Sequence, residues 1–223
     1  MAAHFTANDI SFVLSVIELA KRQPCPVFFG WSVDPSVERA RNILTASFLA
    51  SPCTHILFCD TDIGFTPEQV DRITSHDVGV VGGLYPLKEL SPIPKWCSNA
   101  HPTKPPVRAD GLLQVSYIGT GFMCVRRDVF EKIISKIGQH LSYIPAGKTE
   151  GREYAFWRQG VRDGRFLTED WQFCQDVNEL GGQIFADTQV ILTHAGRAEW
   201  PLPWQMEPNA FELGAEARRV GIA

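Results

Sequence analysis

The stretch Ile56-Leu57-Phe58-Cys59-Asp60-Thr61-Asp62 joins an apolar run directly to two carboxylates that lie one residue apart. Such a run is typical of a buried strand, and the polar residues after it then lie at the strand's carboxyl end, where α/β proteins bind ligands. Two carboxylates turned into one site repel each other unless a cation lies between them. Oxygen ligands favour a hard divalent ion that keeps positions open for substrate phosphates, so the stretch predicts a metal-diphosphate site for Mg²⁺ or Mn²⁺.

Helical and strand patterns alternate on both sides of this stretch, which predicts an α/β fold. Thr66-Pro67-Glu68-Gln69 combines a capping box with a proline in the first turn, so a helix is expected to begin just after the carboxylates. Other helices are expected to begin at Asp34-Pro35, Asp128 and Thr168. Apolar runs predict further strands at 26–31, 78–81, 113–118, 122–125 and 190–193.

Length and charge narrow the class of protein. A chain of 223 residues can bury one full core, so a single domain over 1–223 is expected. The net charge is −4 and no basic run stands out, which argues against a nucleic-acid partner. No apolar stretch reaches the length of a membrane span, and Met1-Ala2-Ala3-His4-Phe5 has no signal-peptide pattern, so we expect a cytoplasmic location. The six cysteines form no CxxC pair and are expected to be reduced core thiols.

Two segments carry no clear period. Residues 139–167 contain tyrosine, tryptophan and several arginines in an irregular order, and a connection of this length is usually functional or mobile. We interpret it as a mobile loop that could close over a site and exclude water. The tail at 197–223 is expected to end in a short helix.

Several of these motifs occur together in an order that resembles a known family. They are Arg41-Asn42 on a helix, Asp60-Thr61-Asp62 after a strand, Tyr85-Pro86-Leu87-Lys88 after a glycine turn, Thr168-Glu169-Asp170 at a helix start, and His194 after a strand. The order is similar to that of glycosyltransferases of the GT-A fold, in particular the family 2 type and its small viral and bacterial relatives, over about residues 36–196. The resemblance implies a Rossmann-like mixed sheet flanked by helices, as in nucleotide-diphospho-sugar transferases. It also implies a hexosyltransferase that moves a sugar from a nucleotide-sugar donor, in the first place a UDP-sugar, to a glycan or another hydroxyl acceptor.

The resemblance assigns a role to each motif. Asp60 and Asp62 match the DxD motif that holds Mn²⁺ or Mg²⁺ against the diphosphate, and His194 matches a late histidine that often adds a metal ligand. Asp170 matches the general base of inverting members, and Glu169 is the substitute candidate.

Basic residues are the candidates for contacts with the nucleotide. Arg41 and Lys88 match positions that contact the nucleotide or its phosphates in relatives, and Arg39 is a further candidate on the same helix. Surface solubility is the competing explanation for all three.

Alternatives remain open at each level. Asp60 and Asp62 can form a polar turn, Asp170 a helix cap, and His194 a structural contact. A nucleotidyltransferase would use the same metal-diphosphate chemistry, and a sugar- or nucleotide-binding module without catalysis would keep the same residues. A haloacid-dehalogenase-type phosphatase is disfavoured because Gly64 replaces the Thr or Val of its motif, and a dehydrogenase because no full GxGxxG follows an early strand.

Overall fold

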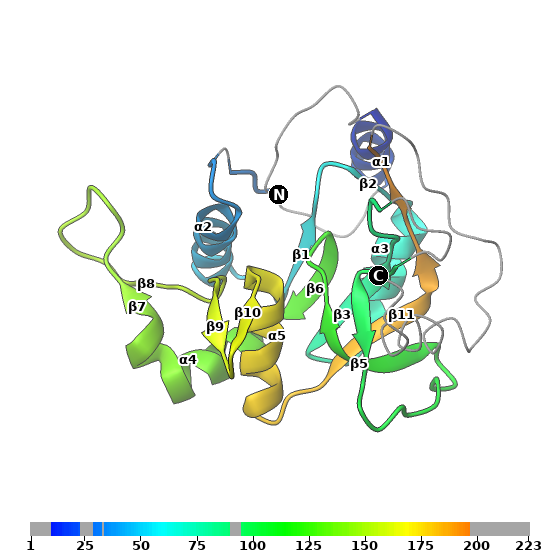
Figure 1. Cartoon of the computed structure of the whole chain (residues 1–223). Coiled ribbons are helices and arrows are strands. Elements are labelled where there is room, and N and C mark those ends of the chain that lie inside the picture. Colours follow the sequence, from blue (N-terminus) through cyan, green and yellow to red (C-terminus); the bar gives the residue numbers. More distant parts are fainter. Residues whose placement is uncertain (1–9, 23–28, 33, 90–94, 197–223) are drawn as a thin grey trace.

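Figure 1 shows the computed structural model of the chain, which describes residues 10–22, 29–32, 34–89 and 95–196. It is an α/β structure with a mixed sheet of six strands flanked by helices, in the order β1-β6-β3-β11-β5-β4. The strands are β1 His55–Cys59, β3 Val80–Leu84, β4 Ser98–Ala100, β5 Leu112–Ile118, β6 Phe122–Arg126 and β11 Ile184–Ile191. The expected α/β mixed sheet is therefore confirmed.

The sheet brings several carboxyl ends to one edge. The central pair β3–β11 is parallel, and β6 lies antiparallel to both β1 and β3. Strands β1, β3 and β11 therefore run in one direction. The segments that follow them emerge at the same edge, beside the turn at 119–121 between β5 and β6.

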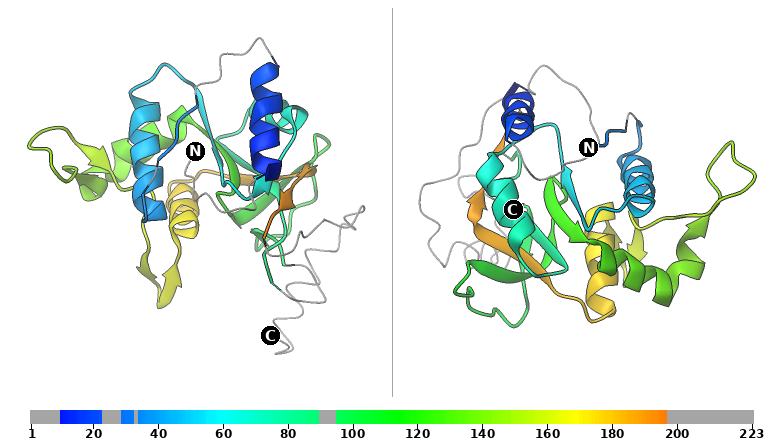
Figure 2. Two further views of the ribbon diagram at one scale, coloured as in Figure 1. Left: turned by 90° about the horizontal axis from the view of Figure 1, so that it is seen from above. Right: turned by 180° about the vertical axis from the view of Figure 1, so that it is seen from behind.

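The described part of the chain contains five helices, and Figures 1 and 2 show how they flank the sheet. They are α1 Ile10–Lys21, α2 Val37–Leu49, α3 Pro67–Ser75, α4 Arg127–Leu141 and α5 Glu169–Glu179. Helix α3 contacts β3 and β11, whereas α5 contacts β5 and packs against α4. None of the helices in the described part of the chain is long and apolar enough to cross a bilayer. The side chains of β3 are all buried, as expected for a strand in the middle of a sheet covered by helices.

Two of the predicted helix starts need correction. The capping box at Thr66 and Gln69 is confirmed, with Pro67 in the first turn. Helix α2, however, is capped by Ser36, whose hydroxyl accepts from the Arg39 N–H, because Asp34 instead accepts from the Ser36 N–H in the preceding turn.

Helix α4, in contrast to α2, begins before the predicted residue. Its N-cap is Arg126 and not Asp128. Strand β6 runs directly into this helix because the Arg127 guanidinium donates to main-chain carbonyls after α2, including those of Ser51 and Cys53. These bonds fix the start of the helix without a side-chain cap.

The predicted strands were largely correct in the middle of the chain. Those at 113–118 and 122–125 are confirmed as β5 and β6, and the strand at 78–81 is shifted to β3. The expected strand at 190–193 is wrong in extent. It is the end of β11, followed by the short strand β12 Thr193–His194, which pairs with β2 Ile63–Gly64. Half of the expected strand at 26–31, residues 26–28, falls outside the described residues, and 29–31 are not in a strand.

The length of strand β11 was underestimated because polar residues interrupt its apolar pattern. Asp187 is fully buried, and its carboxylate accepts from Arg72 and His76 of the α3 region. The register against β3 shifts between Asp187 and Ile191. A buried acid with two partners of this kind cannot be inferred from periodicity alone.

Residues 139–167 contain two hairpins in place of an irregular loop. The first pairs β7 Ser142–Tyr143 with β8 Glu153–Tyr154, and the second pairs β9 Gly160–Arg162 with β10 Arg165–Leu167. Between them Trp157 is fully buried. The mobility of the segment stays a prediction, and the tail at 197–223 lies outside the described residues. The five described cysteines are free thiols, in line with the expectation for reduced residues.

Candidate functional site

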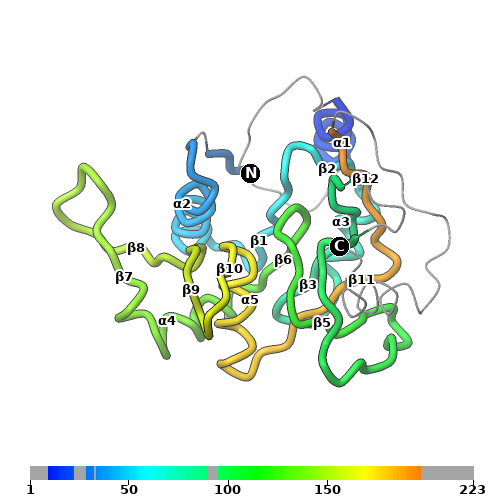
Figure 3. Tube along the Cα trace, in the orientation of Figure 1, coloured from blue at the N-terminus to red at the C-terminus, as the bar shows by residue number. Residues whose placement is uncertain are grey.

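The candidate site lies at the edge where β1, β3 and β11 end. Asp60 and Asp62 follow β1, Lys88 lies just beyond β3, and His194 belongs to β12 after β11. Figure 3 traces β12 beside β2, and β2 is the strand that directly follows the two aspartates in the chain. The Asp60 N–H donates to the Gly121 carbonyl (3.0 Å), and the Ala195 N–H donates to the Asp62 carbonyl (2.7 Å). Main-chain bonds thus hold the aspartate loop to the β5–β6 turn and to the histidine strand.

Asp62 is the half-buried acid of the site. Its Oδ2 lies 2.5 Å from Lys88 Nζ and 3.5 Å from His194 Nε2. Burial raises the pKa of this carboxyl, but hydrogen bonds from His194 and Lys88 outweigh burial and lower the pKa to about 2. The other oxygen, Oδ1, is buried and has no hydrogen-bond partner among the described residues. Because an unsatisfied buried oxygen is costly, this atom is suited to a ligand.

His194 is oriented by the main chain. Its Nδ1 lies 2.7 Å from the Pro86 carbonyl oxygen. Since a carbonyl can only accept, Nδ1 carries a proton, and Nε2 is the ring nitrogen that faces the Asp62 carboxylate. A hydrogen bond from one ring nitrogen to a main-chain carbonyl, which fixes the orientation of the other nitrogen, is typical of a metal-binding histidine.

Asp60 belongs to a separate ion-pair group. Arg41 of α2 is buried, and its Nη2 donates to Asp60 Oδ1 at 3.1 Å. The other end of the same guanidinium pairs with Glu169 at the start of α5. Burial raises the pKa of Glu169, although the Arg41 charge opposes that effect. Arg41 therefore ties the end of β1 to the start of α5.

Asp170 is the more accessible acid of the α5 start. Its Oδ1 accepts from the Thr168 hydroxyl at 2.5 Å and from the Trp171 N–H at 2.8 Å. No hydrogen bond from a described residue reaches its second oxygen, Oδ2. Glu169, by contrast, is 8% exposed and engaged with Arg41. Of the two acids, Asp170 is the one with an oxygen available to a ligand.

Tyr85 shapes the floor beside these acids, and the sequence motif alone did not reveal its role. Its hydroxyl oxygen accepts from the Gly121 N–H at 2.9 Å, and its ring packs edge-on against the His194 ring. A Cβ at Gly119 or Gly121 would lie 2.5 or 2.6 Å from this hydroxyl. The two glycines of the turn are thus required by the tyrosine beneath them.

The remaining predicted residues separate into two groups. The structure brings together Asp62, Lys88 and His194, and next to them Asp60, Arg41 and Glu169. Arg39 does not join either group, because its exposed guanidinium pairs with Asp34 at 2.6 Å. Within the described ranges no cluster of three or more His, Cys, Asp or Glu side chains is arranged to hold a metal ion. The carboxylates are instead paired with Arg41 and Lys88.

The sheet order, the covering helices and the site at the carboxyl ends define an α/β protein consistent with a Rossmann-like fold. No family model matches the chain, and no curated protein matches it. Among solved structures it resembles A197 from STIV, with a TM-score of 0.54 and 15% sequence identity, over 92% of this chain and 94% of A197. At that identity the likeness concerns the fold alone.

Proposed function

We propose that the chain is a metal-dependent glycosyltransferase of the GT-A type, which transfers a sugar from a nucleotide-diphosphate sugar to a hydroxyl acceptor. A UDP-sugar is the first donor to test, and Mn²⁺ or Mg²⁺ the metal. The observation that carries the proposal is the buried Asp62 Oδ1, which lacks a partner among the described residues, at the edge of the sheet where Asp60 and His194 also lie.

The proposed ligands of the divalent ion are Asp62, His194 and Asp60. Asp62 offers an oxygen without a partner among the described residues, and the His194 ring offers Nε2 with its other nitrogen already fixed by Pro86. Asp60 would add a second carboxylate, which Arg41 holds near the loop. Oxygen and imidazole ligands of this kind suit Mn²⁺ as well as Mg²⁺. When bound, the ion would act as a Lewis acid that neutralises charge on the departing diphosphate.

Lys88 has two roles in this proposal. Without a ligand, its ammonium compensates the Asp62 charge at 2.5 Å. Its side chain is about one third exposed, so it can turn toward a phosphate once another cation occupies the carboxylate. Lys88 would then stabilise the leaving diphosphate by direct charge pairing.

Asp170 is the proposed general base. The exposed N–H groups and the helix dipole favour negative charge at a helix N-terminus. The Thr168 hydroxyl and the Trp171 N–H orient Oδ1 and leave Oδ2 for the acceptor hydroxyl. Glu169 is the weaker candidate because its carboxylate is engaged by Arg41.

The experiment measures release of nucleoside diphosphate from a panel of nucleotide sugars with Mn²⁺, with Mg²⁺ and with EDTA. We expect metal-dependent release by the native chain and its loss in Asp62→Ala, with an unchanged circular dichroism spectrum. Glu131→Gln, an exposed acid on α4, is the matched control and should keep full activity. Near-native release by Asp62→Ala would contradict the proposed site. Sugar 1-phosphate as product would instead indicate nucleotidyl transfer.

A second variant tests the base. Asp170→Asn removes the proton acceptor but keeps the shape of the side chain, so transfer should fall by about 100-fold or more. Donor binding, measured by thermal stabilisation with UDP and Mn²⁺, should persist. Unchanged transfer would leave Asp170 with only a helix-capping role.

A binding module without catalysis is the second candidate function. The observation in its favour is that Arg41 and Lys88 already pair with the two aspartates, so each aspartate has a cationic partner without a metal. Such a module should be stabilised by a nucleotide sugar yet release no nucleoside diphosphate with any metal.

A further inference from the structure

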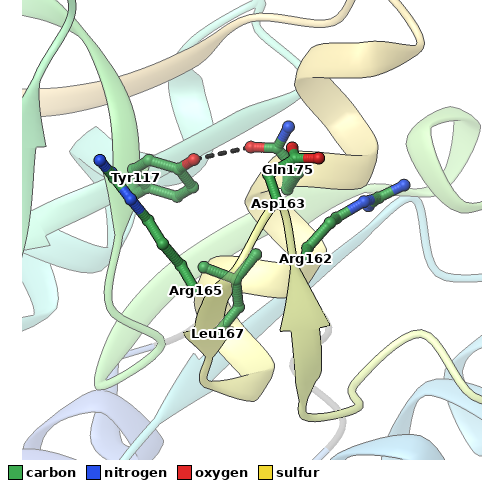
Figure 4. Close-up of a pocket in the computed structure, with 6 residues that line it drawn as sticks. All are labelled: Tyr117, Arg162, Asp163, Arg165, Leu167 and Gln175. Carbon is green, nitrogen blue, oxygen red and sulfur yellow. Dashed lines mark hydrogen bonds between the residues drawn. The ribbon is translucent and has the colours of Figure 1, made fainter.

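A second site lies between the β9–β10 hairpin and the outer side of α5. It is a pocket of about 340 Å³ lined by Tyr117, Arg162, Asp163, Arg165, Leu167 and Gln175 (Figure 4). This volume is within the range of small-molecule sites. Tyr117 forms a wall of the pocket and is held in place within the protein, because its hydroxyl donates to Gln175 Oε1 at 2.6 Å. The Tyr117 ring also stacks on Trp171, with centroids 4.6 Å apart and planes 10° from parallel.

The hairpin places two arginines next to each other. Arg165 lies directly opposite Arg162 in the antiparallel register. Like charges in this position destabilise a strand pair. Arg162 is neutralised by Asp176 at 3.0 Å and Glu179 at 2.8 Å. Arg165 forms no ion pair with a described residue, so one positive charge at the pocket is left without a carboxylate partner.

The pocket also offers groups that suit sugar hydroxyls. Asp163, at the turn of the hairpin, lines the same pocket and forms no ion pair with Arg165. A carboxylate of this kind accepts hydrogen bonds from hydroxyl groups. In Figure 4, Arg165 extends toward Tyr117, whereas Arg162 points to the other side of the pocket. Cation, hydroxyl and carboxylate thus surround one small cavity.

The pocket is close to the proposed base along one helix. Gln175 is five residues after Asp170 in α5, which corresponds to about 7.5 Å along the helix axis. The Trp171–Tyr117 stack lies between them, and Tyr117 is near the end of β5 that leads into the glycine turn of the site. The pocket and the proposed base therefore lie on the same helix and are connected through the Trp171–Tyr117 stack.

We propose that this pocket binds the acceptor through an anionic group, a carboxylate or phosphate carried on a sugar, with Arg165 as the residue that determines specificity. As an acceptor subsite the pocket rests on the proposed glycosyltransferase function, whereas binding of the anionic sugar itself does not. Arg165 pairs with the anion, Asp163 accepts from the sugar hydroxyls, and Tyr117 forms the wall.

The test is an NMR titration of the full chain with three probes, glucose, glucuronate and glucose 6-phosphate, without donor or metal. A charge-assisted contact should make at least one charged sugar bind about tenfold more tightly than glucose. The stronger of the two charged probes identifies carboxylate or phosphate as the preferred group. Equal affinity for all three probes would overturn the proposal.

Two variants assign the effect to the pocket. Arg165→Gln should weaken binding of the charged sugar about fivefold or more and leave glucose unaffected. Arg152→Gln, which removes the same charge from the neighbouring hairpin, should bind like the native chain. Equal binding by the two variants would overturn the role of Arg165.

A third variant covers the case in which Arg165→Gln does not fold. Tyr117→Phe keeps the stack on Trp171 and removes the hydroxyl of the wall, so it should weaken binding of the charged sugar, and native affinity would count against the pocket. Because the titration contains no nucleotide sugar, its outcome is separate from nucleoside diphosphate release. A chain that releases no diphosphate can still bind the charged sugar. A chain that releases diphosphate but does not bind the charged sugar would contradict only the proposed pocket.

Discussion

At the scale of single residues, the central feature is a carboxylate with two different oxygens. Asp62 Oδ2 is close to Lys88 and His194, whereas Oδ1 is buried without a partner in the described part of the chain. The hydrogen bonds to Oδ2 keep the acid ionised, and the lack of a partner leaves Oδ1 able to bind a ligand. Both follow from the position of Asp62 between the ends of β1, β3 and β11.

The lowered pKa of Asp62 predicts a specific acid sensitivity. The folded pKa is about 2 and the ordinary value is 3.8, so this residue stabilises the native chain above pH 4 and loses that effect as the pH falls toward 2. The contribution is at most about 2 kcal/mol. Urea unfolding of the native chain and of Asp62→Asn should therefore differ most at neutral pH and converge between pH 4 and pH 2. Asp163→Asn, on the hairpin turn, should keep the native pH dependence of the free energy of unfolding. A difference between the native chain and Asp62→Asn that stays constant with pH would contradict the lowered pKa of Asp62.

The sequence predicted most of the acids of the site, but not their pairing. Asp60 and Asp62 could be selected because they follow an apolar run, and Asp170 and His194 through the resemblance to GT-A glycosyltransferases. The pairing of Asp60 with Arg41 and of Asp62 with Lys88 could not be predicted, because it depends on the packing of α2 and of the segment after β3. Arg39 was selected with Arg41, yet the structure directs it to Asp34.

At the scale of elements, the segment at 139–167 is anchored at its middle. The Trp157 main chain exchanges two hydrogen bonds with the Asn42 amide, at 2.8 and 3.0 Å, and its indole N–H donates to the Thr45 hydroxyl. The ring packs edge-on against Phe58 and stacks on Phe173. Motion of the segment is therefore expected in the two hairpins and not at their junction. The sequence did not reveal this anchor, because strands of two or three residues leave no period.

Substitution of the anchor should be costly. Trp157→Ala removes a fully buried ring and should lower the free energy of unfolding by about 3 to 5 kcal/mol. Trp31→Ala is the matched control, since that ring is 73% exposed and its loss should change stability by less than about 0.5 kcal/mol. Urea denaturation followed by circular dichroism measures both. Similar values for the two variants would contradict the anchoring role.

At the scale of the whole molecule, one core connects both sides of the sheet. A single cluster of buried side chains extends from Phe12 of α1 through the central strands to Phe173 of α5. The α/β class, the helix after the aspartates and the middle strands followed from local patterns. The strand order did not, because β6 inserts between β1 and β3 through contacts distant in sequence.

This continuous core predicts cooperative unfolding. Urea transitions followed by tryptophan fluorescence and by far-ultraviolet circular dichroism should coincide, as for a single domain. Two separate transitions would instead indicate that 1–223 contains more than one folding unit.

The tyrosine beneath the glycine turn has an evolutionary consequence. Among the described residues, the Tyr85 hydroxyl is the nearest atom to an added Cβ at Gly119, at 2.5 Å, and the next atoms lie at 3.4 Å, whereas at Gly121 the ring carbons also lie at 2.7 and 3.0 Å. Gly119→Ala should therefore be strongly destabilising alone and partly rescued by Tyr85→Phe, whereas Gly121→Ala should not be rescued. A double-mutant cycle for each pair measures the difference. Among homologues, alanine at 119 should be tolerated only where position 85 has lost its hydroxyl, while 121 should remain glycine in either background.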